Sequence, residues 1–282
     1  DVSVFEAPAK LNLSLLVEPP KSDGYHPITS LVQTIEWCDR LEVEEAVDDN
    51  FTVVGADIDP EDNLVVKAIA AARLVRPLPP LSIRLEKRIP IGAGLGGGSS
   101  DAAATLLAAF SFGAYDDAVL TETASSLGAD VPLFLVGGTI LMSGYGEIIE
   151  AQPHLGELAV AVAVPAFSLS TADVYRRWDE LEGPTGETPS PGSLPPALRD
   201  GMPIRNDLTP AAMDLEPTLG DFIADLRAMW GSAVLMTGSG SACFGLFPDR
   251  GEADDAARAV TGRSRVAFGA DLRIHGVSRV EE

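Results

Sequence analysis

The sequence predicts an α+β protein built from two lobes. Its 282 residues suit one large domain or two modest ones, and either can bury a sizeable core. Expected strands bunch in the first half of the chain, whereas strands and helices alternate in the second half. This order favours helices layered on antiparallel sheets, of the split βαβ type, over a single doubly wound sheet. The hydrophobic share of 46% and the charged share of 22% exclude a wholly disordered chain.

The first half of the chain carries period-two apolar patterns that are typical of strands at residues 11–17, 33–43 and 81–85. Between them, residues 62–75 are rich in alanine, begin with Asp-Asn and are followed by Pro77. Such a cap and terminator predict a helix. We further expect helices at 100–110 and 121–127, a strand at 138–144, and either type of element at 131–136.

The second half of the chain predicts strands at 158–164, 233–236, 242–247 and 271–277, and helices at 171–181, 216–230 and 252–260. Residues 182–196 are dense in proline and glycine. Such a composition prevents regular structure, so we expect an exposed loop there.

The charge balance argues against some partners. Twenty basic residues against 42 acidic ones give a formal net charge of −22, so the chain lacks the positive field of a general nucleic-acid or anionic-membrane binder. Cys38 and Cys243 lie far apart without metal-ligand spacing, and we expect two reduced thiols. No apolar run approaches the roughly 20 residues of a membrane span, and no signal peptide is visible. We therefore expect a cytoplasmic protein.

The most informative segment is the glycine-rich stretch 90–104, which has five glycines within residues 92–98. Glycine is costly in a folded chain, so this density indicates a backbone requirement. A tight turn that leads into an Ala-rich helix points several N–H groups at one place, and the helix dipole adds to their effect. The segment therefore predicts an anion-binding loop, with the hydroxyls of Ser99 and Ser100 at the start of the helix.

Three other interpretations of this loop are weaker. Residues 92–97 superficially fit the dinucleotide-binding GxGxxG pattern, but charged residues and Pro90 stand where a buried strand is required. A Walker A loop needs a lysine after the glycines, and none follows. A simple turn with a capped helix is the third interpretation, and it does not account for five glycines.

The stretch 90–100 resembles the phosphate loop of the GHMP small-molecule kinases, Pro-x-Gly-x-Gly-Leu-Gly-Ser-Ser. Lys10, within Pro-Ala-Lys-Leu-Asn-Leu, resembles their N-terminal motif. Residues 236–242 resemble their third glycine motif, centred on Gly238, Ser239 and Gly240. That last segment also suits a β-hairpin, and the two interpretations are compatible.

The resemblance implies a two-lobed fold. Residues 1–152 would form an ATP-binding lobe like domain 2 of ribosomal protein S5, and residues 153–282 would form a ferredoxin-like lobe. It further implies that ATP is bound by Pro90, Gly92, Gly94, Leu95, Gly96, Gly97, Gly98, Ser99, Ser100 and Asn63. Asn63 is an equally good helix cap.

Three more segments, residues 23–26, 128–132 and 206–208, resemble one branch, the 4-diphosphocytidyl-2-C-methyl-D-erythritol kinases of isoprenoid biosynthesis. This branch transfers phosphate from ATP to the 2-hydroxyl of a CDP-alcohol. The resemblance implies that Asp130 accepts the hydroxyl proton, with Lys10 as its positively charged partner. Without the motifs, Asp130 would be read as a turn or cap residue, and Lys10 as a residue at the rim of the strand.

The same branch implies a cytidine site. Tyr25 and His26 would bound the base, Tyr175 would be the second aromatic wall, and Thr171 and Asn12 would contact the substrate. The branch more often has phenylalanine at the position of Tyr175. Without the motif, Tyr25 would be read as a residue at the edge of the core and His26 as an ordinary loop histidine.

The kinase chemistry implies Mg²⁺ with ATP. Asp101 could help to hold the ion, but we favour stabilisation of the helix dipole because other members carry asparagine there. We expect small-molecule substrates, no nucleic acid or membrane, and a monomer or weak homodimer. The alternatives are another GHMP kinase, of mevalonate or homoserine type, and a non-catalytic nucleotide-binding relative.

Overall fold

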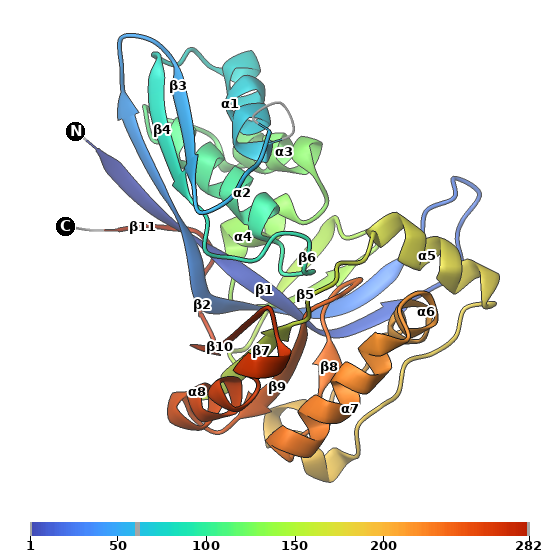
Figure 1. The fold of residues 1–282 in the computed structure, drawn as a ribbon. Coiled ribbons are helices and arrows are strands. Elements are labelled where there is room, and N and C mark those ends of the chain that lie inside the picture. Colours follow the sequence, from blue (N-terminus) through green and yellow to red (C-terminus); the bar gives the residue numbers. More distant parts are fainter. Residues whose placement is uncertain (1, 60–62, 281–282) are drawn as a thin grey trace.

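The computed structural model describes residues 2–59 and 63–280, and it contains two β-sheets that carry helices (Figure 1). The first sheet has the order β11-β1-β2-β4-β3, with β5 paired to β2 and β6 paired to β5, and the second has the order β10-β7-β9-β8. The strands are β1 (Ser3–Val17), β2 (Ile28–Glu45), β3 (Asn50–Val54), β4 (Leu81–Glu86), β5 (Thr139–Ser143), β6 (Ile148–Gln152), β7 (Ala159–Val164), β8 (Leu235–Met236), β9 (Cys243–Phe247), β10 (Val266–Asp271) and β11 (Ser278–Arg279).

Helices cover both sheets, which confirms the predicted α+β class. The α-helices are α1 (Leu64–Val75), α2 (Gly97–Phe110), α3 (Asp117–Leu127), α4 (Val131–Val136), α5 (Thr171–Glu180), α6 (Thr209–Leu215), α7 (Thr218–Trp230) and α8 (Arg250–Ala259). Figure 1 shows α1 to α4 gathered on the first sheet and α5 to α8 around the second. None of the described helices has the length and apolar character that a membrane span requires.

Strand β7 explains how the two sheets meet. All six of its residues are buried, and its side chains alternate between two apolar clusters. Ala161 packs with the helices of the second sheet, whereas Val160 and Val162 pack with Leu11 and Ile35 of the first sheet. A strand buried on both faces reads as a continuous apolar run, as residues 159–164 do. A shared core therefore joins the sheets.

The chain crosses from the first sheet to the second after β6, and β11 returns to pair with β1. The prediction of a strand at 271–277 was wrong, because β10 ends at Asp271. The backbone beyond it bonds to helix α4 instead, with Gly276 N donating to Val136 O and Val277 N to Phe134 O. A Cβ on Gly137 would lie 1.8 Å from Gly276 N, so this close approach requires glycine.

Other differences are smaller. The segment 131–136 is helical, and helix α1 begins at Leu64 with Asn63 as its N-cap, while residue 62 of the predicted helix lies outside the described residues. Strands β3 and β6 and helix α6 were not predicted. The loop 182–196 is mostly exposed as expected, but Leu194 is buried, next to a short 3₁₀ turn.

Candidate active site

The glycine-rich loop connects β4 to α2 and is shaped by left-handed glycines. Gly94 has φ 78° and Gly96 has φ 72°, values that residues with a Cβ atom rarely adopt. A Cβ on Gly94 would lie 2.5 Å from Thr237 O and 3.1 Å from Gly240 O. The loop is therefore packed directly against the third glycine motif, and only glycine permits that approach.

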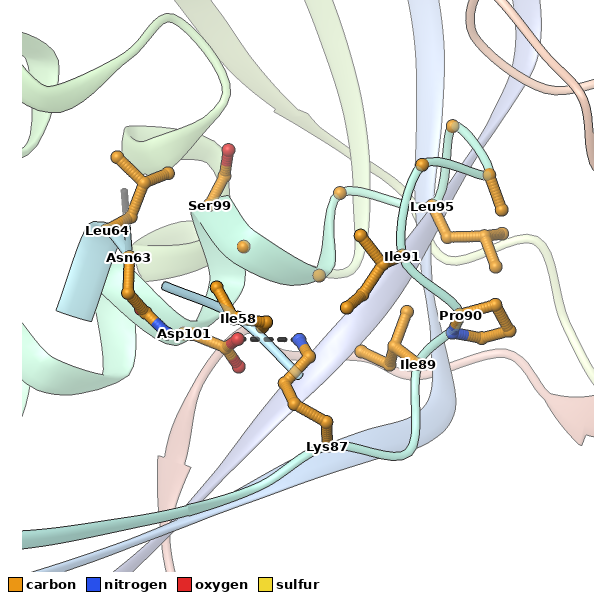
Figure 2. A pocket seen from close by; sticks show the side chains of 16 residues that line it. Ile58, Asn63, Leu64, Lys87, Ile89, Pro90, Ile91, Leu95, Ser99 and Asp101 are labelled. Atoms are coloured by element: carbon orange, nitrogen blue, oxygen red, sulfur yellow. Dashed lines mark hydrogen bonds and ion pairs between the residues drawn. The ribbon is translucent and has the colours of Figure 1, made fainter. Parts of the chain in front are cut away.

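The first turn of α2 is left open to an anion. Its N-cap is Gly96, which offers no side-chain acceptor to the first amides of this 14-residue helix. A cavity of about 350 Å³ lies beside these amides. Figure 2 shows the loop and the side chains that surround the cavity. The predicted ATP-binding residues that line it are Asn63, Pro90, Gly92, Gly94, Leu95, Gly96, Gly97, Gly98 and Ser99.

Ser100 differs from that prediction, because the structure does not place it on the cavity wall. It is completely buried within α2, and its Oγ has no hydrogen-bond partner among the residues that the structure describes. Asn63 keeps its capping role while it lines the cavity, since its Oδ1 accepts a hydrogen bond from Val65 N at 2.9 Å. The two interpretations of Asn63 are therefore compatible.

Lys10 and Asp130 are brought together from distant parts of the sequence. Lys10 Nζ lies 3.7 Å from Asp130 Oδ2, with side-chain exposures of 6% and 39%. Asp130 occupies the N-cap position of α4, but its side chain makes no capping hydrogen bond to the described residues of this helix. The main chain of Lys10 donates to Leu95 O at 2.9 Å, which fixes this pair beside the glycine loop.

Asn12 connects this pair to the third glycine motif. Its Oδ1 accepts a hydrogen bond from Lys10 Nζ at 2.5 Å, and its main-chain N donates to Thr237 Oγ1 at 2.9 Å. Asn206 stabilises the third glycine motif, because its Nδ2 donates hydrogen bonds to Met236 O at 2.8 Å and to Gly238 O at 2.7 Å. The Asn-Asp-Leu segment singled out in the sequence thus has a structural function here.

The predicted substrate residues form a second group around α5. His26 stacks on Tyr175 with ring centroids 5.1 Å apart, and Trp178, which the sequence did not reveal, meets His26 edge-on at 5.4 Å. Tyr25 is 71% exposed and contacts the ring of Tyr145 instead. The structure thus brings two of the three predicted aromatic residues together.

Two further contacts connect this aromatic group to the reaction site. Thr171, at the start of α5, has its Oγ1 2.8 Å from Ser239 Oγ of the third glycine motif. Burial raises the pKa of Tyr175 to about 12, and the negative charge of Asp130 adds to this shift. Tyr175 therefore lies within electrostatic reach of Asp130 and is a neutral phenol at physiological pH.

The sequence reasoning missed a buried ion triad at the edge of the cavity. Lys87 Nζ donates to Asp101 Oδ2 at 2.6 Å and also contacts Asp39 Oδ2. Figure 2 shows Lys87 and Asp101 pointing toward each other. The dipole interpretation of Asp101 is wrong, because Asp101 lies beyond the first turn of α2 and is buried. The chain has only four lysines, and their scarcity indicates a partner of opposite charge for Lys87, as it does for Lys10.

A cluster of metal-type ligands in the described part of the chain consists of Glu6, Glu36 and Cys38. Arg273 is inserted among them, and its Nη1 lies 3.0 Å from Glu6 Oε2 and 2.7 Å from Glu36 Oε2. Burial raises the pKa of the Cys38 thiol to about 12, so it is a poor metal ligand. A buried arginine thus takes the place of a cation at this cluster.

Comparisons with known proteins agree with this geometry. Residues 63–138 match the family described as GHMP kinases N terminal domain, and residues 193–264 match GHMP kinases C terminal. A curated relative from Agrobacterium fabrum, named 4-diphosphocytidyl-2-C-methyl-D-erythritol kinase, is 37% identical over 264 residues, with 87% of each chain covered. A relative of the same name from Mesorhizobium japonicum is 39% identical over 280 residues, with 95% of each chain covered.

Solved structures give the same result. A crystal structure of 4-(cytidine 5'-diphospho)-2C-methyl-D-erythritol kinase is 36% identical and superimposes with a TM-score of 0.79, covering 95% of this chain and 98% of that one. A homoserine kinase from Cytophaga hutchinsonii, 17% identical with a TM-score of 0.70 over 99% of this chain and 98% of that one, shares the fold. The chain belongs to the GHMP kinases, and within them to the 4-diphosphocytidyl-2-C-methyl-D-erythritol kinase family.

Proposed function

We propose that this kinase transfers the γ-phosphoryl group of ATP to the 2-hydroxyl of 4-(cytidine 5'-diphospho)-2-C-methyl-D-erythritol in isoprenoid biosynthesis. The observation that carries this proposal is the Lys10–Asp130 pair, fixed by Leu95 beside a glycine loop whose first helical amides lack a side-chain cap. The names of the relatives supply the substrate.

In the proposed reaction the substrate hydroxyl oxygen forms a bond to the γ-phosphorus, while the bond from that phosphorus to the β–γ bridging oxygen breaks and ADP leaves. Asp130 accepts the hydroxyl proton as the new bond forms. Lys10 holds the Asp130 carboxylate and offsets negative charge on the reacting oxygens. The glycine-loop amides bind the phosphates that do not react.

Mg²⁺ is part of the proposal, because it neutralises phosphate charge in this chemistry. The open amides of the first turn of α2, beside the cavity, fit a triphosphate that carries its own cation. Asp101 is poorly suited as a ligand, because Lys87 lies 2.6 Å from its Oδ2 and burial raises the pKa of Asp101 well above its usual value. We assign the ion no protein ligand.

The cytidine end of the substrate is proposed to bind at the aromatic group of α5. Tyr25, His26 and Tyr175 would bound the base, with Thr171 and Asn12 as polar contacts. This placement is supported by the His26–Tyr175 stack and by the hydrogen bond of Thr171 to the third glycine motif. A cytoplasmic location, a monomer or weak homodimer, and lobes divided between residues 152 and 153 complete the proposal.

Replacing Asp130 by asparagine tests the proposed base. We expect kcat to fall by roughly 10²–10⁴-fold, because asparagine keeps the shape but cannot take the proton. Asp48→Asn changes an exposed aspartate and serves as the matched control. Near-normal turnover of Asp130→Asn would refute the base assignment.

A substrate panel tests the choice of acceptor. We expect ADP release with the CDP-alcohol and none with mevalonate or homoserine. The reverse result would identify another GHMP kinase activity. No ADP release with any acceptor would favour a non-catalytic relative.

A further inference from the structure

The proline- and glycine-rich loop after α5 is held firmly at its first residues. Trp178 Nε1, near the end of α5, donates a hydrogen bond to Pro184 O at 2.9 Å. Gly186 is buried although most of this loop is exposed, and its N donates to Asp207 Oδ1 at 2.9 Å. We call residues 183–187 the strap. The strap connects the end of α5 to the Asn-Asp-Leu segment that contains Asp207.

The strap packs directly against the residue that holds the third glycine motif. A Cβ on Gly186 would lie 2.1 Å from Asn206 O and 2.6 Å from Asn206 C, so this close approach requires glycine. Asn206 in turn donates hydrogen bonds to Met236 O and Gly238 O. A shift of the strap at Gly186 therefore moves the residue that shapes the motif.

Helix α5 is attached to the third glycine motif at both of its ends. At its start, Thr171 Oγ1 lies 2.8 Å from Ser239 Oγ, within hydrogen-bond distance. At its end, Trp178 reaches the motif through the strap and Asn206. The ten residues of α5 span about 15 Å at the usual rise per residue, so the two attachments are far apart. One attachment would leave the helix able to tilt, whereas two fix the direction of its axis.

The surroundings of the strap do little to replace these attachments. A cavity of about 630 Å³ lies between the strap and helices α6 and α7, with Thr185 and Glu187 on its wall. Figure 1 shows the chain after α5 running along the outer side of these two helices. Glu187 pairs with Arg227, and Arg177 of α5 pairs with Asp214 of α6, but both pairs are exposed. Exposed ion pairs contribute little to stability. The position of α5 relative to the motif therefore depends on the strap.

We propose that the strap is a positioning segment for the acceptor alcohol, because it fixes the direction of α5 and so keeps Thr171 and Tyr175 at a constant distance from the reaction site. This inference rests on the proposed function, in which these two residues contact the acceptor. We assign the strap no contact of its own with either substrate. It acts because a site that is ordered before binding loses less conformational entropy when the substrate binds.

Two tryptophan variants test the strap through matched hydrogen bonds. Trp178→Phe removes the donor to Pro184 O and should raise the KM for the CDP-alcohol about fivefold. Its kcat and its KM for ATP should stay within about twofold of the wild type. Trp230→Phe is the control, because Trp230 Nε1 donates to Ala256 O at the same distance of 2.9 Å. The control should lose a similar amount of stability and keep both KM values.

A second pair of variants acts from the other end of the strap, because the ring of Trp178 also contacts His26. Gly186→Ala pushes against the main chain of Asn206 and should also raise the KM for the CDP-alcohol about fivefold. Gly192→Ala is the control in the same loop, since its Cβ would meet none of the described atoms within 4 Å.

The double variant Trp178→Phe/Gly186→Ala shows whether the strap acts as one unit. Both substitutions release the same segment, so the double variant should have the KM of the stronger single variant. Independent effects would instead multiply to about 25-fold.

Hydrogen exchange provides a readout that does not depend on substrate. Release of the strap should speed the exchange of the α5 amides in Trp178→Phe and in Gly186→Ala, because the helix then opens more often. Gly192→Ala and Trp230→Phe should leave the exchange of α5 as in the wild type.

Four outcomes would contradict the proposal. Equal KM values for the CDP-alcohol in Trp178→Phe and Trp230→Phe overturn this inference alone. So do wild-type exchange of the α5 amides in Gly186→Ala and KM effects that multiply in the double variant. A wild type that does not phosphorylate the CDP-alcohol overturns the proposed function, and with it the role of the strap in binding the acceptor.

Discussion

Lys87 is the residue whose removal should damage stability most clearly. The side chains of Asp39, Lys87 and Asp101 are 0%, 4% and 3% exposed, so the two carboxylates depend on one buried cation. Asp39 has further partners, since its Oδ1 accepts a hydrogen bond from Ile89 N at 2.8 Å, whereas Asp101 Oδ1 has no partner within residues 2–59 and 63–280. Replacing Lys87 by methionine keeps the volume and leaves two buried carboxylates without a cation.

The expected cost of Lys87→Met is about 3–5 kcal/mol, the usual result of removing one partner of a buried ion pair. For a chain of this length that corresponds to a fall in Tm of roughly 6–20 °C. Lys67→Met is the matched control, because Lys67 is an exposed lysine on α1. Urea unfolding followed by circular dichroism measures both variants, and an equal cost for the two would refute the reasoning.

The loss of stability caused by Lys87→Met should also depend on pH. Burial raises the pKa of Asp101 well above 3.8, and the charge of Lys87 only partly opposes this. The folded chain therefore binds this proton more tightly than the unfolded chain, and the stability gained is lost as pH rises through the folded pKa. Burial lowers the pKa of Lys87, but Asp101 and Asp39 outweigh it and raise the pKa overall, so Lys87 stays charged at neutral pH.

Without Lys87 the positive charge that opposes the effect of burial on the pKa of Asp101 is lost. The penalty of Lys87→Met should therefore be larger at pH 8 than at pH 5, and the double variant Lys87→Met/Asp101→Asn should recover part of it at pH 8. A penalty that is the same at both pH values would contradict the assignment of charge to the triad.

Two other substitutions test how the loops are held. Gly94→Ala should destabilise the protein by about 2 kcal/mol and raise the KM for ATP, because its Cβ would lie 2.5 Å from Thr237 O at a positive φ. Gly98→Ala, whose Cβ meets nothing closer than 3.8 Å, is the control, and an equal loss of Tm in both would contradict the packing argument. Asn206→Ala should cost about 1–3 kcal/mol, because two buried carbonyl groups of the third glycine motif lose their donor. Thermal unfolding measures this cost, and an unchanged Tm would show that the motif holds its shape without Asn206.

The parts of the site that the sequence predicted are those encoded by local backbone chemistry. Five glycines before an Ala-rich segment required a left-handed turn at a helix start, and the turn is found between β4 and α2. The pairing of Lys10 with Asp130 across 120 residues came from the resemblance to a kinase family rather than from periodicity. The structure confirms that the two side chains meet.

What the sequence could not predict depends on long-range pairing. The apolar alternation at 271–277 suits a strand, but Arg273 is buried there by Glu6 and Glu36, more than 230 residues away. Lys87 likewise finds Asp39 from β2, 48 residues earlier. A local sequence pattern does not show which distant carboxylate neutralises a buried lysine or arginine.

Because the net charge of the chain is −22, it matters that the glycine-rich loop is already ordered before a nucleotide binds. A strongly acidic chain gains no long-range attraction for a triphosphate, so affinity has to come from short-range donors. The loop is held on both sides, because Lys10 N donates to Leu95 O at 2.9 Å and Ala242 N donates to Ala93 O at 3.1 Å. Its amides are therefore ordered when the chain folds, and little ordering entropy is left to lose when the nucleotide binds. Packing of the glycine loop between the two lobes thus supports affinity for the triphosphate, to which surface charge contributes in basic nucleotide-binding proteins.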